Sequence, residues 1–431
     1  MNTIQSVRGT KDQLPAEIQK WQQLEDAARK VSAQFGYQEI RTPIFEKTEV
    51  FARGVGDGTD IVNKEMYTFA DRGGDSITLR PEQTAAVVRS VIQNNLLADV
   101  SALRLFYIGQ YFRYERPQKG RLREFHQFGV EILNSPHPES DIEVILLALN
   151  FINRIGIKDY NLKINSLGND ASRNNYKQAL VTYLNDNITK LSQESQNRLT
   201  GNPLRILDSK DKNDIEVVAA APIILDYLDN ESKEHFDFTK EILDNSNAHY
   251  EIVPTLVRGL DYYSHIVFEF QNTHLGAQDS FGGGGRYNKL FSQLGGKDIP
   301  AVGFAMGMER LLIILEQVNP TIEPRKIDVC VVPTNEKFIK YAINISQTIK
   351  SHFPNISCFM DVNRRSLKAQ MRDANKNNVR FAVIIGDQEY ETQSVSIKSM
   401  QDDANLASTN DNKQVTIKTT DLIKFFTSNC L

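Results

Sequence analysis

Cysteine is scarce in this sequence, with three residues among 431. Cys330, Cys358 and Cys430 are widely scattered and form no Cys-x-x-Cys pair. This spacing argues against a disulfide framework and against a thiolate zinc site. The seven histidines show no metal-ligand spacing either. We therefore expect no metal site built from protein side chains alone.

Long apolar runs are also missing. No segment approaches the roughly 20 consecutive apolar residues of a membrane helix, and the N-terminal stretch MNTIQSVRGTKDQLP has no apolar signal core. We expect a cytoplasmic protein with no membrane segment. Internal repeats and long low-complexity tracts are absent, and the 40% hydrophobic and 24% charged composition is ordinary for a globular chain.

The last quarter of the chain reads as a separate domain. Two prolines in NPTIEPRK place a boundary at 319–326, and beyond it predicted strands alternate with helices, which is typical of a small α/β domain. Residues 326–431 hold 14 Lys and Arg against 11 Asp and Glu, although the whole chain has a net charge of −4. This mild basic excess is a weak indication that one part of the protein meets a polyanion.

The earlier part of the chain mixes helices and strands. Apolar residues at three- and four-residue steps predict a helix over 17–35, followed by a short strand over 37–43 that stops at Pro43. Two strands, 104–115 and 123–133, flank a loop with the sequence RPQKGR, and another strand is predicted over 256–270. The polar, helix-forming stretch at about 170–250 reads as an inserted module.

Charges are concentrated in FRYERPQKGRLREFHQFGVE (112–131), although its flanks are apolar. Since side chains alternate along a strand, Gln127 and Glu131 share one face with a gap at Gly129, whereas Phe128 and Val130 share the other. Internal Arg–Glu pairing is one explanation. The alternative is a polar floor for a charged ligand, in which Arg113 grips an anion and the loop residues Arg116, Lys119 and Arg121 meet phosphates.

Two glycine-containing segments could complete such a floor. In VGFAMGMERL, small residues alternate with large ones, which lets a flat ring or a backbone approach closely. Arg310 then stands in the first turn of a helix, where the dipole favours anions, so it indicates a bound anion or stacking on a base. Pairing of Arg310 with a nearby carboxylate is the alternative. The run FGGGGRY suits a backbone in close contact, or else a flexible surface loop.

Three of these segments together resemble the class II aminoacyl-tRNA synthetases. Residues 17–43 resemble motif 1, a long interface helix and a strand ending in proline. Residues 112–131 resemble motif 2, with Arg113 at the position of its arginine, and residues 303–315 resemble motif 3.

More specific are LVRGLDYYSHIVFEF and GGGGRY, which resemble the two signature peptides of the histidyl-tRNA synthetases. RGTKD, TLRPE, FRYERPQKGR and VGFAMGMERL fit the same family, so the resemblance covers almost the whole chain. It implies an α+β fold with a class II antiparallel sheet flanked by helices. The implied domains are a catalytic domain at 1–325, with a helical insertion at about 170–250, and an α/β anticodon-binding domain at 326–431. A homodimer is also implied.

The implied reaction activates L-histidine with ATP, accompanied by Mg²⁺, to histidyl-adenylate and pyrophosphate. Histidine is then transferred to the 3′ end of tRNA(His). Two alternatives remain: a non-catalytic regulatory paralogue of histidine biosynthesis, and a histidine-adenylating enzyme or RNA-binding module that no longer charges tRNA. The regulatory paralogue would not need Arg258, Arg310 or a tRNA-binding C-terminal domain.

The resemblance also assigns roles by position, with Arg113 and Arg258 as the catalytic residues at the α-phosphate. Arg310 would bind the ATP tail and stack on the base, Glu82, Thr84 and Gln127 would hold the α-ammonium group, and Glu131 and Tyr263 would read the imidazole. The implied ATP-binding set is Arg113, Glu115, Arg121, Gly303 and Arg310. The implied histidine-binding set is Glu82, Gln83, Thr84, Arg113, Gln127, Glu131, Arg258, Tyr262 and Tyr263.

Some residues keep an alternative explanation or depart from the family pattern. Tyr262 and Tyr263 are also compatible with core packing. The basic residues of the C-terminal domain fit either phosphate contacts or a solvated face; they are Arg364, Arg365, Lys368 and Arg372. Gln83, Asn288 and Ala305 stand where the family usually has glycine, aspartate and glycine, and Gln83 puts the loop around the amino group of histidine in doubt.

Overall fold

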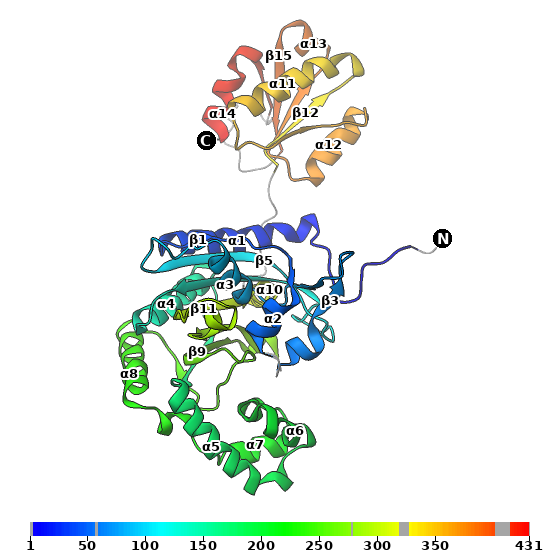
Figure 1. Cartoon of the computed structure of the whole chain (residues 1–431). Coiled ribbons are helices and arrows are strands. Elements are labelled where there is room, and N and C mark those ends of the chain that lie inside the picture. Colours follow the sequence, from blue (N-terminus) through cyan, green and yellow to red (C-terminus); the bar gives the residue numbers. More distant parts are fainter. Residues whose placement is uncertain (1–2, 57–58, 277–278, 319–326, 401–413, 431) are drawn as a thin grey trace. The chain divides into compact units, whose positions relative to one another are not determined.

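The computed structural model describes residues 3–56, 59–276, 279–318, 327–400 and 414–430 (Figure 1). The chain divides into two compact units, residues 1–322 and 323–431. The boundary predicted at 319–326 lies outside the described residues. Among the described helices, none combines the length and the apolar character that crossing a membrane requires.

The described part of the first unit is built on a sheet of eight strands. Most neighbouring strands are antiparallel, and only the short outer strands β1 and β8 pair in parallel with their neighbours. In spatial order the strands are β1 (Gln38–Glu39), β5 (Leu103–Phe112), β6 (Glu124–Leu133), β11 (Ala301–Gly307), β10 (Ser280–Arg286), β9 (Ser264–Gln271), β7 (Asn161–Ser166) and β8 (Glu251–Ile252).

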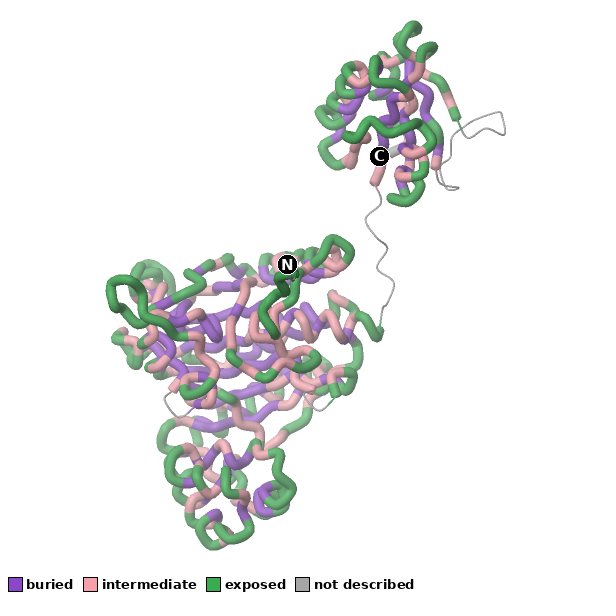
Figure 2. The backbone as a smooth tube through the Cα atoms, turned by 90° about the vertical axis from the view of Figure 1, so that its right-hand side faces the viewer, coloured by how far each residue is buried: buried purple, intermediate pink, exposed green. Residues whose placement is uncertain are grey.

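Helices cover both faces of this sheet, and the buried residues concentrate in its central strands (Figure 2). The helices of this body are α1 (Pro15–Gln34), α2 (Thr48–Val55), α3 (Thr84–Gln93), α4 (Pro138–Arg154), α9 (Leu290–Gln293) and α10 (Met308–Val318). Alternation along β9 shows the division: Phe268 and Phe270 belong to the core beneath α1, α4 and α10, whereas Val267 belongs to the core beneath α3.

A smaller sheet and a π-helical turn complete the body. The small sheet has the order β2 (Phe45–Lys47), β4 (Ser76–Leu79) and β3 (Tyr67–Ala70), and the turn is Ile61–Glu65.

The predicted first helix is confirmed as α1. Trp21, Leu24, Ala28 and Val31 recur at three- and four-residue steps and are all buried. They form the stripe that packs α1 against α4 and α10. Pro15 occupies the first helical position, where its missing N–H is not needed.

The part of the chain between β7 and β8 is mainly helical, and we call it the insertion. Its helices are α5 (Asp170–Asp186), α6 (Gln193–Gly201), α7 (Lys212–Val218) and α8 (Asn230–Asn245), with 3₁₀ turns at Ile188–Lys190, Pro203–Asp208 and Ile224–Tyr227. Figure 1 shows α5, α6 and α7 as one group beside the sheet, whereas α8 packs on α4.

Three strand predictions are wrong in their extent. The strand at 37–43 shrinks to Gln38–Glu39, and β5 ends at Phe112, so Arg113 and Glu115 lie in the following loop. The strand predicted at 256–270 begins only at Ser264. Its first half is irregular because the carbonyl groups there are bonded by side chains rather than by a neighbouring strand.

The glycine run, by contrast, is not a surface loop. Gly282–Gly285 form the middle of β10, pair with β9 and β11, and are fully buried. A Cβ atom on Gly284 would lie 1.9 Å from the carbonyl oxygen of Gly303, so only glycine allows the two strands this spacing.

The described part of the second unit is a five-stranded mixed sheet with helices, as the α/β prediction required. Its strands in spatial order are β13 (Cys358–Met360), β12 (Val329–Pro333), β14 (Phe381–Ile385), β15 (Ser394–Ser399) and β16 (Gln414–Lys418). Its helices are α11 (Ile339–His352), α12 (Leu367–Lys376), α13 (Asp387–Glu391) and α14 (Leu422–Cys430). The sequence did not predict β16, α13 or α14.

Candidate active site

One cavity of about 310 Å³ opens over the middle of the large sheet. β6, β10 and β11 contribute to its floor, and loops from four other parts of the chain form its walls. All thirteen site residues predicted from the sequence line this cavity: Glu82, Gln83, Thr84, Arg113, Glu115, Arg121, Gln127, Glu131, Arg258, Tyr262, Tyr263, Gly303 and Arg310.

A buried carboxylate, that of Glu131, marks one part of the cavity. Three hydroxyl groups donate to it: Tyr287 to Oε2 at 2.5 Å, and Thr84 and Tyr107 to Oε1 at 2.8 and 3.1 Å. Burial raises the pKa of Glu131 to about 8, although the hydroxyl donors favour the charged form. Two carboxylate oxygens offer about four acceptor positions, so a ligand N–H can still bind here.

Glu82 lies beside it at the start of α3. Its carboxylate accepts the backbone N–H groups of Thr84 at 2.7 Å and Ala85 at 2.9 Å, which satisfies two donors of the first helical turn. Burial raises the pKa of Glu82, against the effect of these N–H donors. The amide of the neighbouring Gln83 is bonded to Thr42 and Tyr111. The Gln83 side chain therefore links this loop to Thr42 and to Tyr111 of β5.

Arginines mark the other part of the cavity. Arg113 donates from Nε to the Pro81 carbonyl at 2.9 Å and lies over the ring of Phe125. Arg310 donates from Nε to the Gly120 carbonyl at 3.0 Å and also bonds the Ser280 carbonyl. Neutral carbonyl groups thus help to position both of these side chains in the cavity.

The pKa of Arg310 shows that other cations lie close to it. Burial lowers its pKa, and the positive charges of Arg121 and Arg113 lower it further. Arg121 itself is paired with Glu115, whereas Arg116 and Lys119 of the same loop do not line the cavity. An anionic ligand with several charges would relieve this repulsion.

Arg258 has a carboxylate partner, Glu269 on β9. Burial acts to lower the pKa of Arg258, but Glu269, the two tyrosines and Asp208 act together against it and the pKa is raised. Arg258 lies against the glycine run, since a Cβ atom on Gly283 would be 2.9 Å from its guanidinium carbon. The glycines of β10 thus make room for a fixed guanidinium group.

The small residues of β11 also make room for a neighbouring side chain. A Cβ atom on Gly303 would lie 1.7 Å from Oε2 of Glu131. Gly303, Ala305 and Gly307 line the cavity, whereas Met306 belongs to the core on the opposite face, as the alternation predicted.

Tyr262 and Tyr263 are both buried and both line the cavity. Their rings lie 4.7 Å apart, and Tyr262 also contacts the ring of Tyr287 at 5.5 Å. The two tyrosines therefore pack in the core and also face the cavity, so both explanations from the sequence hold. Burial raises the pKa of the Tyr263 phenol, which keeps it a neutral donor at physiological pH.

Sequence reasoning assigned no role in the site to six polar residues of the cavity. They are Tyr107 and Tyr287, which hold Glu131, Glu269, which pairs with Arg258, Asp208 of the insertion, Ser280 and Glu309. Tyr287 ends the GGGGRY peptide and Glu269 lies within LVRGLDYYSHIVFEF, so the two peptides were the signal that could have revealed both residues. Asp208 carried no local signal, because the fold alone brings it to the cavity.

An antiparallel sheet with a strand–loop–strand arginine, an alternating small-residue strand and a following Glu-Arg helix defines a class II aminoacyl-tRNA synthetase. The family model described as histidyl-tRNA synthetase matches residues 9–311, and the anticodon binding domain model matches residues 328–429. The chain belongs to the histidyl-tRNA synthetase family, which confirms the predicted fold and enzyme class.

Individual relatives agree. The chain is 48% identical over 402 residues to the histidine–tRNA ligase of Gloeothece citriformis, covering 93% of this chain and 92% of the relative. It is 47% identical over 402 residues to that of Acholeplasma laidlawii, covering 93% and 95%. The crystal structure of apo S. aureus histidyl-tRNA synthetase matches with a TM-score of 0.81 and 34% identity, covering 98% of this chain and 100% of that one.

The regulatory alternative is not favoured. A Bacillus halodurans structure whose title names both an ATP phosphoribosyltransferase regulatory subunit and a histidyl-tRNA synthetase matches at 21% identity and a TM-score of 0.64, which shows the shared fold alone. Arg258, Arg310 and a C-terminal unit that matches the anticodon binding model are all present here.

Proposed function

We propose that this chain attaches histidine to tRNA(His) in two steps at the cavity over the large sheet. In the first step a carboxylate oxygen of L-histidine attacks the α-phosphorus of ATP, and the bond to pyrophosphate breaks. In the second step the terminal ribose hydroxyl of the tRNA attacks the carbonyl carbon of the adenylate, and AMP leaves. Positioning and charge stabilisation dominate the first step, so arginines rather than nucleophiles suit this site.

The convergence of Arg113, Arg258 and Arg310 on one cavity is the observation that supports this proposal best. Arg113 and Arg258 are assigned to the α-phosphate as catalytic residues. Arg310 is assigned to the ATP tail and the base, and Arg121 is positioned for a phosphate once Glu115 releases it. Gly303 lets the substrates approach the backbone of β11.

The opposite part of the cavity suits histidine. Glu82 and Gln127 are assigned to the α-ammonium group with the Thr84 hydroxyl. Glu131 and Tyr263 are assigned to the imidazole, with Tyr262 packed beside them. A carboxylate and a phenol match the two ring nitrogens, which gives selectivity by hydrogen bonding rather than by shape alone.

Mg²⁺ is proposed to enter with ATP as the counter-ion of its phosphates. The described residues contain no group of three acidic, histidine or cysteine side chains arranged for a metal. A magnesium ion in such sites is commonly held by one or two carboxylates and by substrate phosphates. Glu115 and Glu269 line the arginine-rich part of the cavity and would be available to the ion if the ATP phosphates draw Arg121 and Arg258 away from them.

We assign residues 1–325 to the catalytic domain and 326–431 to an anticodon-binding domain. In the latter, Arg364 pairs with Glu336, and Arg365 pairs with Asp361 and Asp373. The Arg364–Glu336 pair is largely exposed, so a phosphate can replace that carboxylate at little cost, whereas Arg365 is half-exposed and one of its partners, Asp361, is buried. We therefore propose these arginines as phosphate contacts, together with Lys368 and Arg372.

We also propose a cytoplasmic homodimer. The residues preceding α1 are apolar and exposed at Ile4, Val7 and Leu14, with 96%, 67% and 58% of their surfaces accessible. A second copy of the chain would cover such side chains.

Two assays test the function. Histidine-dependent exchange of pyrophosphate into ATP should be rapid, and labelled histidine should be transferred to tRNA(His). Exchange without transfer would favour an adenylating enzyme that no longer charges tRNA. Absence of both activities in the folded protein would favour a regulatory protein and overturn the proposal.

A further inference from the structure

The segment that carries Arg258 and the two tyrosines, residues 253–263, contains neither helix nor strand. Its backbone is held instead by side chains from elsewhere. Asn165 on β7 donates from Nδ2 to the carbonyl groups of Pro254 and Leu256, at 3.0 Å each. These two bonds attach the beginning of the segment to β7 of the large sheet.

The insertion holds much of the remainder, together with one hydrogen bond from the Asp261 N–H to the Val55 carbonyl of α2 at 3.3 Å. Arg205, in the turn Pro203–Asp208, donates from Nη1 to the carbonyl of Arg258 at 3.2 Å. Asn202 donates to Oδ1 of Asp261 at 2.7 Å. Arg173 on α5 donates from Nη1 to the carbonyl groups of Asp261 and Tyr263, at 3.3 and 3.2 Å. We call Arg173, Asn202 and Arg205 the insertion clamp.

Arg258 depends on this support. Its guanidinium group pairs with Glu269 through Nη1, but its buried Nε atom has no hydrogen-bond partner among the described residues. Since Nε is not held, the position of the guanidinium group is set by Glu269 at one end and by the backbone of residue 258 at the other. Gly259 allows the close approach, because a Cβ atom there would lie 3.3 Å from Nη1 of Arg205.

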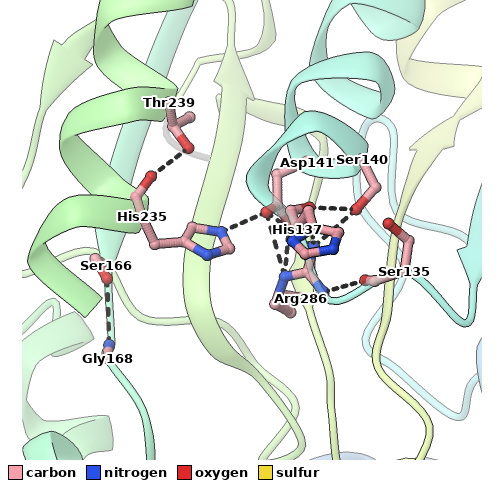
Figure 3. Close-up of polar contacts among 9 residues, drawn as sticks. All are labelled: Ser135, His137, Ser140, Asp141, Ser166, Gly168, His235, Thr239 and Arg286. Atoms are coloured by element: carbon pink, nitrogen blue, oxygen red, sulfur yellow. Dashed lines mark hydrogen bonds and ion pairs between the residues drawn. The ribbon is translucent and has the colours of Figure 1, made fainter. Parts of the chain in front are cut away.

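The insertion is itself fixed to the body at a second point (Figure 3). His235 on α8 bonds Oδ2 of Asp141 at 2.5 Å, and Arg286 bonds the same carboxylate from Nε and Nη2. Arg286 and Asp141 are completely buried, and Arg286 also bonds the carbonyl groups of Ser135 and His137. The clamp therefore acts from a module that is anchored rather than loosely attached.

We propose that the insertion clamp positions Arg258 for adenylate formation, so that the insertion is a working part of the amino-acid activation site. The inference rests on the proposed function of Arg258. Arg173, Asn202 and Arg205 are positioning residues. Arg173 and Arg205 bond the backbone of the catalytic segment, Asn202 bonds the side chain of Asp261, and their role is to hold the segment rather than to touch the reacting atoms. Asp208, from the same turn as Arg205, lines the cavity and brings its charge toward Arg258.

The test compares Arg205→Ala with a matched control, Arg198→Ala, in the full-length protein. Arg198 also belongs to the insertion and also reaches the body, through Asp60 at 3.6 Å, but its ion pairs within the described residues go to Asp60 and Glu194 and not to residues 253–263. The first readout is kcat and KM in histidine-dependent pyrophosphate exchange. The second is hydrogen–deuterium exchange of the peptide that covers residues 253–263, which needs no activity.

We expect Arg205→Ala to lower kcat roughly tenfold, on the scale of one lost hydrogen bond to a buried group. The KM for ATP should change less than twofold, and the amides of 253–263 should exchange faster. Arg205→Lys, which keeps one donor, should restore part of both. Arg198→Ala should match the wild type. If Arg205→Ala does not fold, Asn202→Ala serves as the second variant, with the same two readouts and a smaller expected effect.

Unchanged kcat and unchanged hydrogen exchange in Arg205→Ala and Asn202→Ala would overturn the clamp. Equal losses in Arg205→Ala and Arg198→Ala would also overturn it, because general docking of the insertion would then be responsible. If the wild type shows no pyrophosphate exchange, the proposed function fails, but faster hydrogen exchange of residues 253–263 in Arg205→Ala still supports the clamp.

Discussion

The hydroxyl of Tyr287 lies 2.5 Å from Oε2 of Glu131, although 156 residues separate the two in the chain. Thr84 and Tyr107 hold the other carboxylate oxygen. Three donors from three segments thus fix the orientation of one buried carboxylate. Its remaining acceptor capacity points into the cavity where histidine is proposed to bind.

Tyr287→Phe should weaken histidine binding. Loss of this hydroxyl leaves a buried carboxylate oxygen with one donor fewer, which typically costs about 1–2 kcal/mol. We expect the KM for histidine in pyrophosphate exchange to rise roughly tenfold, with the KM for ATP unchanged. Tyr250→Phe is the control, because the Tyr250 hydroxyl bonds Asp244 at an exposed position. An unaltered KM for histidine in Tyr287→Phe would contradict the positioning of Glu131 by this phenol.

Gly303→Ala should block histidine activation by displacing Glu131. The added methyl group would lie 1.7 Å from Oε2 of Glu131 and 2.4 Å from the Val130 carbonyl, so both must move. We expect exchange activity to fall about 100-fold or more, which corresponds to about 3 kcal/mol in the barrier. Gly201→Ala is the matched control, since a Cβ atom there meets nothing within 4 Å. Comparable exchange rates in the two variants would show that Glu131 has room to shift.

Arg258→His should abolish adenylate formation and leave the protein folded. Removal of one preorganised charged donor commonly lowers kcat by about 10²–10³. Glu269 then remains without its arginine, so a modest fall in melting temperature is expected as well. Pyrophosphate exchange, circular dichroism and size-exclusion chromatography measure these effects. Arg154→His, at an exposed arginine whose side chain bonds Gln34 within the described part of the chain, should behave as the wild type. Near-normal exchange in Arg258→His would remove Arg258 from the proposed role.

The stability of the ligand-free protein should fall with rising pH because of Glu131. Burial raises its pKa to about 8, against about 4.5 in the unfolded chain. The protonated form is thus favoured by folding, and its contribution is complete below about pH 4.5 and is lost as pH rises toward 8. The limiting slope is about 1.4 kcal/mol per pH unit.

Glu131→Gln cannot titrate at this position, so it isolates the effect. Thermal unfolding at intervals between pH 5 and 8.5 should show the melting temperature of the wild type falling relative to that of Glu131→Gln. A difference that stays constant over this range would mean that Glu131 is ionised throughout, held by its three hydroxyl donors.

Much of this protein was determined by local sequence. The three- and four-residue spacing of Trp21, Leu24, Ala28 and Val31 was sufficient to predict α1, because helix geometry alone puts those side chains on one face. Alternation placed Gln127 and Glu131 on the opposite side of β6 from Phe128, and gave β11 its small-residue face. The motifs then identified thirteen residues that share one cavity.

Only the tertiary structure decided the rest. Four glycines in a row are compatible with a loop or a strand, and it is the carbonyl of Gly303 and the guanidinium of Arg258 that require them in β10. The segment before Ser264 was predicted as a strand, but Arg173 and Arg205 of the insertion donate hydrogen bonds to its carbonyl groups. Tyr287 reaches Glu131 across 156 residues, and such contacts follow no local period, because they depend on which strands pair and in what register.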